Sequence, residues 1–454
     1  MLMSPLQQKP FFENVKEFSS GKDSPRDFLE RCIEQYVALE PKIGAFVSVN
    51  LDRARNAADF STERWRQNRP LSLIDGIPVG IKDIIETWDM PTQMGSPLFD
   101  NWRSGRDAAS VAALREAGAV IFGKTVTTEF ASTEPRGTRN PWNPNRTPGG
   151  SSSGSAASVT AGMVSAALGT QVVGSIVRPA GYCGCVGYKP TLGAINRGGS
   201  HDYLSQSCTG TLAATLSDAW VVAREIAARV GGDPGFVGLQ GPEQPPAAAR
   251  PRRLGLFKTS GWPAVDQDCR AAFEAVVKKL SSEGVEVAEE GTFGELAELE
   301  VAIKPAYELT RNIQAYEQRW PLNTYREHDR GGLSPIMLNR LAKSEKMTAV
   351  EYEELLTART QIREKYSRLK NKCDALITLS ASGIAPTGLR SSGDPGFAVP
   401  ASLLGVPTIS LPVMTVSGMP LGLQIIGFES DDAALFGVSA WIAELLKPPG
   451  GWNA

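Results

Sequence analysis

The feature that most constrains the fold is an alternation of short apolar runs with helical segments. Residues 77–85 are almost wholly apolar, residues 108–116 have helical spacing, and a buried strand is predicted at 119–122, after Gly118. The order strand, helix, strand recurs later, at 254–257, 266–282 and 285–287. Such an alternation predicts an α/β fold rather than an all-helical or all-strand one.

Other segments have weaker but readable patterns. Ser24 and Pro25 form a helix start signal ahead of an amphipathic stretch. Helices are expected at 27–39, 51–66, 156–168 and 432–446 and through most of 296–369, with further strands at 375–379, 408–411 and 423–426. Residues 138–155 read as a long loop rich in Pro, Asn, Gly and Ser, and long loops of that kind are often functional.

Composition excludes several classes of protein. The net charge is −2, so the chain lacks the excess of Lys and Arg that would indicate a nucleic-acid partner. No apolar run reaches transmembrane length and no secretory signal is visible, so we expect a cytoplasmic protein that does not enter a membrane. The six cysteines are scattered and read as free thiols. Cys183 and Cys185 form the one close pair, without the second pair or histidine that a zinc site needs, so no metal is expected.

Lys82 is the first candidate for chemistry, because it lies within the apolar run 77–85. Burial makes the ammonium form costly and lowers the pKa of a lysine. A lysine whose pKa falls toward roughly 7–8 becomes a competent general base. The alternative is a lysine that pairs with Asp83 or extends to solvent.

Two serines follow in glycine-rich surroundings. Ser151 opens the run Ser-Ser-Ser-Gly-Ser at 151–155, after Gly149 and Gly150. Ser175 follows Gly174 in a turn-like segment, where backbone N–H groups can stabilise an oxyanion. Taken alone, each serine is more often part of a loop or of a helix start than a catalytic residue. Since the chain has two histidines, a lysine rather than a histidine is the available base.

Together these motifs resemble the amidase signature family. Lys82 precedes Ser151 by 69 residues and Ser151 precedes Ser175 by 24, which are spacings typical of that family. The resemblance extends over about 76–446 and is weak in the N-terminal helices and between about 241 and 369. Further matching segments are Gly76–Pro78, Gly95–Ser96, Gly123–Thr125 with Glu129–Ala131, Asn140–Pro141, Thr147–Ser152, Gly187–Pro190, Gly405–Pro407 and Pro420–Gln424.

The resemblance implies a single domain over 1–454 with a central twisted mixed β-sheet surrounded by α-helices. Its expected parts are N-terminal helices (1–67), a catalytic core (68–240), a variable strand–helix–strand and helical region (241–369) and the C-terminal part of the core (370–454).

The resemblance also implies the roles of a Ser–Ser–Lys triad. Ser175 would be the acyl-forming nucleophile, Ser151 the bridge after a cis peptide bond at Gly150, and Lys82 the base. Ser152 would support this network with a hydrogen bond. The oxyanion hole would be formed by the backbone N–H groups of Val172, Val173, Gly174 and Ser175.

Departures from the commonest family pattern bear on the substrate. Gln171, Val172 and Val173 stand where most members have Asp, Thr and Gly, and Ser207 lies near where many have an aspartate. Gln171, Arg178 and the segment 393–397 resemble a malonamidase-like branch that also includes aryl-amide and urethane-cleaving members. Gln171, Arg178 and Phe130 are the candidate substrate-binding residues, and Arg178 either binds a substrate carboxylate or holds a loop.

Three further aromatic residues, Tyr203, Trp320 and Tyr325, are candidates for an apolar pocket or for core packing.

Two motifs resemble other kinds of functional site without the structural context that such a site needs. Residues 118–125 match the letters of a phosphate-binding loop, but their bulky apolar residues predict a strand. His201 and Asp202 are adjacent, yet no nucleophile elbow accompanies them.

The sequence therefore predicts an amidohydrolase without a cofactor, a monomer or homodimer, that cleaves small amides, anilides or carbamates (urethanes). Its activity should fall on the acid side, because Lys82 must be neutral. The alternatives are the glutaminase subunit of a tRNA-dependent amidotransferase, against which Gln171 and Ser207 argue, and a catalytically silent scaffold.

Overall fold

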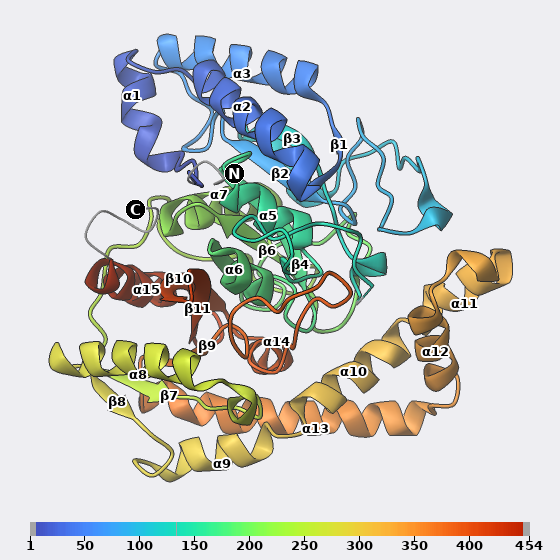
Figure 1. Ribbon diagram of the computed structural model, residues 1–454, viewed down its shortest axis with the longest axis vertical. Coiled ribbons are helices and arrows are strands. Elements are labelled where there is room, and N and C mark those ends of the chain that lie inside the picture. The colour runs from blue at the N-terminus through green and yellow to red at the C-terminus, as the bar shows by residue number, and fades with distance from the viewer. Residues whose placement is uncertain (1–5, 133, 448–454) are drawn as a thin grey trace.

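One mixed β-sheet organises the molecule. A computed structural model describes residues 6–132 and 134–447, and its strands form an 11-stranded sheet in the order β1-β3-β2-β4-β6-β5-β10-β11-β9-β7-β8 (Figure 1). The strands are β1 (Phe46–Val49), β2 (Pro78–Lys82), β3 (Val120–Thr125), β4 (Ala166–Gln171), β5 (Val186–Lys189), β6 (Cys208–Ala213), β7 (Arg253–Leu256), β8 (Glu286–Ala288), β9 (Ala375–Leu379), β10 (Thr408–Val416) and β11 (Met419–Ile426). The expected α/β fold with a central mixed sheet surrounded by helices is confirmed.

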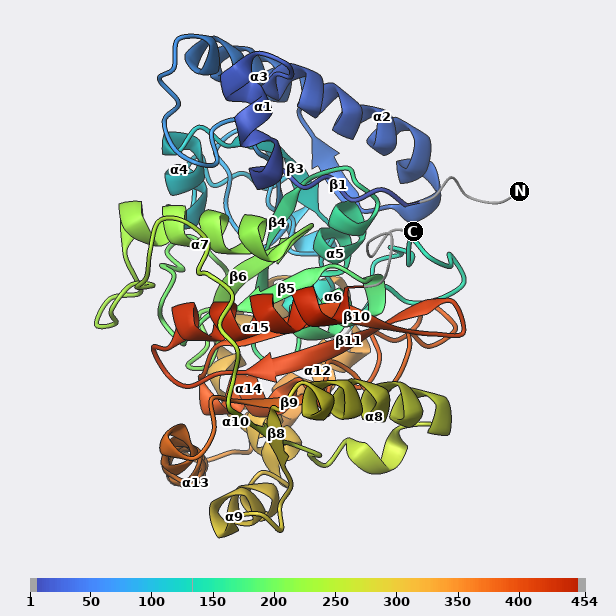
Figure 2. The same ribbon diagram turned by 90° about the vertical axis from the view of Figure 1, so that its left-hand side faces the viewer.

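Helices surround this sheet. They are α1 (Val15–Ser20), α2 (Pro25–Ile43), α3 (Leu51–Arg66), α4 (Ala109–Glu116), α5 (Ser153–Thr160), α6 (Val177–Cys183), α7 (Leu216–Val230), α8 (Gln267–Ser282), α9 (Gly294–Ala302), α10 (Ala306–Glu317), α11 (Arg319–His328), α12 (Pro335–Ser344), α13 (Ala349–Ser367), α14 (Val399–Leu404) and α15 (Asp432–Leu446). Helices α7 and α15 contact each other and lie in front of the strands in Figure 2, while α5 and α6 contact each other and pack on β4 and β5 respectively.

The start of α2 illustrates how local sequence sets these elements. The Ser24 side chain accepts a hydrogen bond from the backbone N–H of Asp27, and Pro25 occupies the first turn, where its missing N–H costs nothing. The predicted start signal at Ser24 and Pro25 is therefore confirmed.

The helix predicted over 156–168 is wrong in its second half. Helix α5 ends at Thr160, and Gly162 then takes a positive φ of 69°, which favours glycine. Residues 166–171 form β4, which is buried along its whole length between β2 and β6. A strand buried on both faces has no alternation of polar and apolar residues, so its small side chains mimic a helix.

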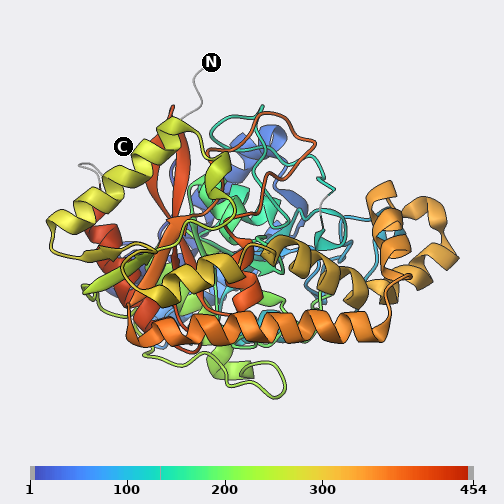
Figure 3. The same cartoon turned by 90° about the horizontal axis from the view of Figure 1, so that it is seen from below.

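The helical region between β8 and β9 forms a separate layer at one end of the molecule. Helix α13 runs alongside α9 and α10, and α11 and α12 lie at the far end of α10 (Figures 1 and 3). This layer has its own apolar cluster, and α10 contacts α14, which leads into β10. Within 6–132 and 134–447 no helix is long and apolar enough to cross a membrane.

Candidate active site

Lys82 is the last residue of β2 and has no exposed surface. Its Nζ donates to Ser151 Oγ at 2.7 Å and to Thr170 Oγ1 at 2.7 Å, with Thr170 O at 3.4 Å. Strand β2 pairs in parallel with β4, so Thr170 near the end of β4 lies beside the end of β2. The lysine is thus held by hydroxyl and carbonyl oxygens rather than by a carboxylate.

This environment favours the neutral form of the Lys82 amine. Burial lowers the pKa of the Lys82 amine to about 7, and the negative charge of Asp202 opposes that shift. Near neutral pH a large fraction of Lys82 is therefore unprotonated and able to accept a proton. The alternative in which Lys82 pairs with Asp83 or reaches solvent does not hold.

A second buried lysine nearby, Lys124, does lie beside a carboxylate. Lys124 on β3 donates to Ile85 O at 2.7 Å and to Thr92 Oγ1 at 2.6 Å, and it lies 3.5 Å from an oxygen of Asp83. The residues that resembled a phosphate-binding loop thus belong to a buried strand, as expected from their apolar side chains. Asp83 and Lys124 form an internal ion pair, and Lys82 has no carboxylate partner among the described residues.

Ser151 and Ser152 are fully buried and lie just before α5. The peptide bond between Gly150 and Ser151 is cis. Ser152 Oγ donates to Thr170 O at 3.4 Å, and its backbone N–H donates to Ser175 O at 3.3 Å. Ser152 therefore connects the segment of Ser151 with the segment of Ser175.

The segment 172–175 joins β4 to α6, and its carbonyl groups are all held. Val172 O accepts from the Gln206 side chain at 3.0 Å and Val173 O from Ser402 Oγ at 3.1 Å. The carbonyl of residue 174 accepts a hydrogen bond from the Arg178 backbone N–H, and the carbonyl of residue 175 accepts one from the Ser152 N–H. This fixes the position of each peptide unit in the segment.

The N–H groups of the same four residues, 172–175, donate no hydrogen bond to any described residue. None of the four has a positive φ, as the presence of Val173 requires. At Gly174 a Cβ would lie 2.8 Å from the Cβ of Ala398, which explains the absence of a side chain there. Four anchored peptides with unpaired N–H groups can stabilise a developing oxyanion.

Ser175 opens into a cavity of about 290 Å³ that is also lined by Val172, Val173 and Arg178. Its side chain is 7% exposed, and Ser175 Oγ has no hydrogen-bond partner among the described residues. Catalytic hydrogen bonds are often long before substrate binds, so a direct bond from Ser175 to Ser151 is not required in the free protein.

Gln171 and Arg178, two of the candidate substrate-binding residues, both hold the main chain. Gln171 Oε1 accepts from the N–H groups of Ile176 and Val177 at 2.8 and 3.0 Å, and its Nε2 donates to Ser402 Oγ. Gln171 is fully buried and does not line the cavity. It positions the start of α6 beside Ser175.

The predicted aromatic residues do not meet at the cavity. Phe130 packs against Phe99 and stacks on Tyr325, with ring centroids 5.4 Å apart in the latter pair, while its neighbours in the chain line the cavity. Tyr203 and Trp320 are 60% and 73% exposed. Ser207 is fully buried next to Gln206 and does not line the cavity either.

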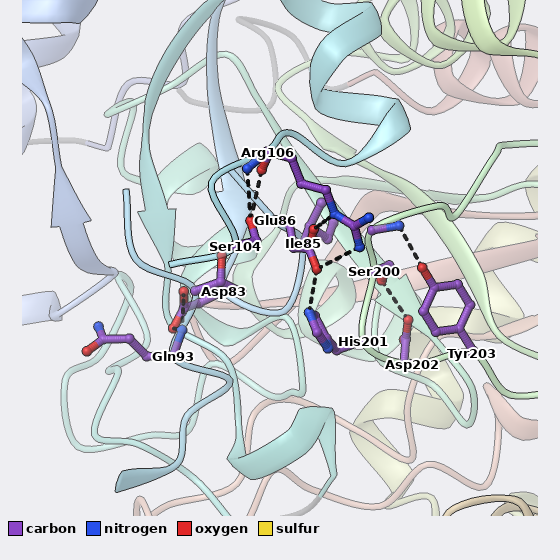
Figure 4. Close-up of polar contacts among 12 residues, drawn as sticks. Asp83, Ile85, Glu86, Gln93, Ser104, Arg106, Ser200, His201, Asp202 and Tyr203 are labelled. Atoms are coloured by element: carbon purple, nitrogen blue, oxygen red, sulfur yellow. Dashed lines mark hydrogen bonds and ion pairs between the residues drawn. The ribbon is translucent and has the colours of Figure 1, made fainter. Parts of the chain in front are cut away.

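His201 belongs to a polar network rather than to a serine triad. Figure 4 shows its ring pointing to Glu86, with Nε2 and Oε1 3.0 Å apart, and Arg106 contacting the same carboxylate. Asp202 accepts from Ser200 Oγ at 2.8 Å, and its other oxygen is buried without a partner among the described residues. This network fixes the segment after β2, and with it the charge of Asp202 that acts on Lys82.

Several residues of the site gave no usable signal in the sequence. Thr170 lies near the nucleophile in sequence, but its contact with Lys82 depends on the pairing of β2 with β4. Ser402 and Arg311 reach the site from regions more than 100 residues away, on α14 and α10.

Comparison with known proteins identifies the family of this chain. The family model described as "Amidase" matches residues 27–436. A glutamyl-tRNA(Gln) amidotransferase subunit from Roseiflexus castenholzii is 33% identical over 96% of this chain and 95% of its own.

Solved structures give the same result. The structure described as "Crystal structure of amidase" is 27% identical, with a TM-score of 0.82 over 96% of this chain and 99% of that one. A bacterial aryl acylamidase shares the fold at 19% identity, with a TM-score of 0.84 over 99% of this chain and 98% of that one. By sequence and by fold, this chain belongs to the amidase signature family, whose members are hydrolases that act on amides.

Proposed function

We propose that the protein is an amidohydrolase that cleaves the C–N acyl bond of small amides, anilides or carbamates through an ester with Ser175. The observation that carries this proposal is a fully buried Lys82, bonded to Ser151 Oγ, near a serine flanked by four unpaired N–H groups. Base, bridge and oxyanion donors are the parts that acyl transfer by a serine needs.

In the proposed first half-reaction, Ser175 Oγ attacks the carbonyl carbon of the substrate. Its proton passes to Ser151, and the proton of Ser151 Oγ passes to the neutral Lys82 amine. The carbonyl oxygen becomes an oxyanion that accepts hydrogen bonds from the N–H groups of 172–175. When the C–N bond breaks, the leaving nitrogen takes the proton back through Ser151, and an ester with Ser175 remains.

In the second half-reaction, water attacks the ester and gives its proton to Lys82 by the same route. The C–O bond to Ser175 breaks, Ser175 regains its proton and the acid is released. An amide thus yields an acid and an amine. A carbamate attacked at the same carbon yields a carbonic acid monoester, which loses carbon dioxide. This route uses the chain's own residues at every proton transfer.

The test is hydrolysis of a p-nitroanilide, a monoamide of a dicarboxylic acid and an aryl carbamate by the wild type and by Ser175→Ala. We expect turnover of at least one substrate by the wild type and its loss in the variant. Turnover that persists in Ser175→Ala would overturn the assignment of the nucleophile. The substrate with the highest kcat/KM defines the acyl group.

The second candidate function is the glutaminase subunit of a tRNA-dependent amidotransferase. It is favoured by the 33% identity to amidotransferase subunits over nearly the whole chain. If this function is correct, the purified chain releases little ammonia from glutamine alone and copurifies with other subunits from its native source. High turnover of simple amides by the isolated chain would rule in favour of the first proposal.

The remaining parts of the sequence-based interpretation stay predictions. They are the cytoplasmic location, the monomeric or homodimeric state, the boundaries at 67, 240 and 369, and the assignment to the malonamidase-like and urethane-cleaving branch.

A further inference from the structure

The cavity at Ser175 contains an unusual concentration of positive charge. Arg178, Arg311 and Arg390 line it together with Ser175, and none of the described lining residues is Asp or Glu. Two acidic residues directly adjoin lining residues in the chain, Glu308 and Asp394, and both are exposed. Asp394 accepts from the Gly396 N–H and lines an adjoining cavity instead. A pocket of this kind is suited to a negatively charged ligand.

Most of the hydrogen-bonding capacity of Arg178 is already used. Its Nη1 donates to Gly393 O at 2.9 Å, and its Nη2 donates to Gly150 O at 2.7 Å and Ser392 Oγ at 3.1 Å. Its Nε is buried and has no partner among the described residues. Arg178 therefore holds the main chain before Ser151, and it cannot offer both outer nitrogens to a carboxylate without losing these bonds.

Arg311 on α10 makes no comparable hydrogen bonds to the main chain of the described residues. Its Nη1 donates to Gln314 Oε1 at 3.1 Å, one turn along the same helix, and it forms no ion pair with a described residue. Burial lowers the pKa of its guanidinium, and the main opposing influence is Tyr307, which lines the same cavity. Arg311 is thus a partly desolvated cation that still has free donors.

Arg340 on α12 does not line the cavity, but it is a second buried cation whose charge acts on the same region as that of Arg311. It is 7% exposed, donates from Nη1 to Gln318 Oε1 at 2.9 Å, and has a buried Nη2 without a partner among the described residues. Burial and the charge of Arg311 lower the pKa of Arg340 to about 9. Because two neighbouring buried cations repel each other, an anion that binds Arg311 in the cavity would reduce the electrostatic cost of the pair.

We propose that the substrates carry a carboxylate in addition to the scissile amide, and that Arg311 contacts this carboxylate. The inference rests on the proposed amidohydrolase function and names its substrate class. Glutamine fits less well than an amide acid without an amino group, because its ammonium would enter a cavity that offers arginines and no lining carboxylate. The small volume restricts the substrate to a short amide acid.

The test compares the monoamides of malonic, succinic and glutaric acid with the corresponding neutral diamides, and the glutaric monoamide with glutamine. The members of each pair have nearly the same shape and differ in charge. For the best monoamide we expect kcat/KM about 10- to 100-fold above that of its diamide, the range expected of a hydrogen bond to a charged group. Glutamine should be a poorer substrate than the glutaric monoamide.

Arg311→Gln should remove most of this preference by raising KM for the monoamide, and Arg311→Lys should retain part of it. Arg326→Gln is the matched control, since Arg326 pairs with Glu345 and does not line the cavity. Equal values for monoamides and diamides in the wild type would overturn the inference. So would an equal loss for both classes in Arg311→Gln.

A binding measurement separates this inference from the proposed function. Calorimetric titration of the Ser175→Ala protein with the three monoamides should give saturable binding, weakened about 10- to 100-fold by Arg311→Gln. Binding without turnover by the wild type would overturn the amidohydrolase proposal and support the anionic subsite. Absence of binding, with Ser175-dependent hydrolysis of neutral anilides, would overturn the anionic subsite and support the amidohydrolase proposal.

Discussion

The two walls of the cavity differ in how their polar groups are used. On the side of β2 and β4, each carbonyl of 172–175 is bonded, and the lysine has defined acceptors. On the side of α10 and α12, Arg311 and Arg340 retain donors without partners. In the first wall the donors without partners among the described residues are the backbone N–H groups of 172–175, whereas in the second wall they belong to arginine side chains.

This difference indicates a division of labour. Of the groups assigned to bond cleavage, Lys82 ends strand β2, Ser151 lies just before α5, and residues 172–175 directly follow strand β4, which pairs with β2 and β6. Arg311, the group assigned to substrate choice, lies on α10, which packs in one apolar cluster, and the neighbouring α12 packs in another. Substitutions in the first wall should therefore affect every substrate, and those in the second should affect anionic substrates selectively.

Ser175→Ala should have the largest effect on the first wall. Loss of a nucleophile typically costs on the order of 10⁴- to 10⁶-fold in kcat. The measurement is steady-state hydrolysis of the best substrate. Ser158→Ala is the control, because Ser158 is a buried serine whose Oγ donates to Ser155 O away from the cavity. A comparable loss in both variants would contradict a specific role for Ser175.

Lys82→Met should reduce kcat by about 10²- to 10⁴-fold for monoamide and diamide alike, since it removes the general base. Lys82→Arg should be similarly inactive, because a guanidinium stays protonated and cannot accept a proton. Thermal unfolding shows whether each variant is folded. Substantial activity in a folded Lys82→Arg protein would mean that Lys82 acts as a hydrogen-bond donor or charge instead.

Arg178→Met should lower kcat/KM about 10- to 100-fold for both substrate classes, since charged hydrogen bonds to the main chain before Ser151 are lost. Comparing the losses of Arg178→Met and Arg311→Gln on anionic and neutral substrates shows which arginine binds the carboxylate. A loss in Arg178→Met that is confined to anionic substrates would assign the carboxylate to Arg178.

The pH profile should show the basic group of the first wall. Because the pKa of Lys82 is lowered to about 7, the amine is neutral and active above that pH and protonated and inactive below it. Well below pH 7, kcat/KM should fall about tenfold per pH unit. The charge of Asp202 raises the pKa of Lys82, so Asp202→Asn should move this acid limb to lower pH. An unmoved limb would show that another group titrates.

Trp320→Ala should have the smallest effect. The side chain is 73% exposed and lies outside the cavity, so the free energy of unfolding should change by less than about 0.5 kcal/mol. Activity on both substrate classes should match the wild type. A selective loss of anilide turnover would instead place Trp320 at the cavity in the working enzyme.

The sequence predicts much of the first wall and little of the second. The apolar run around Lys82 and the glycines beside Ser151 and Ser175 are local signals, and parallel pairing of β2 and β4 brings them together. The position of Arg311 depends on how α10 packs against α12 and α14, which no local pattern encodes.

Among the elements, the failures also have a physical reason. The sequence of β4 resembles a helix because alanine favours helices and a strand buried on both faces has no period of two. The branch resemblance indicates a substrate-binding role for Gln171, which stays a prediction. In the structure its side chain accepts from the N–H groups of Ile176 and Val177, where the chain turns into α6.

The order of strands has a consequence for synthesis of the protein. Strand β5 pairs with β6 on one side and with β10 on the other, and β10 begins at Thr408. While the ribosome is still making the residues between them, one edge of β5 has no partner, and unpaired edges promote aggregation. A fragment that stops at residue 240 would contain Lys82, Ser151 and Ser175, yet it should aggregate, so the catalytic residues depend on the last strands made.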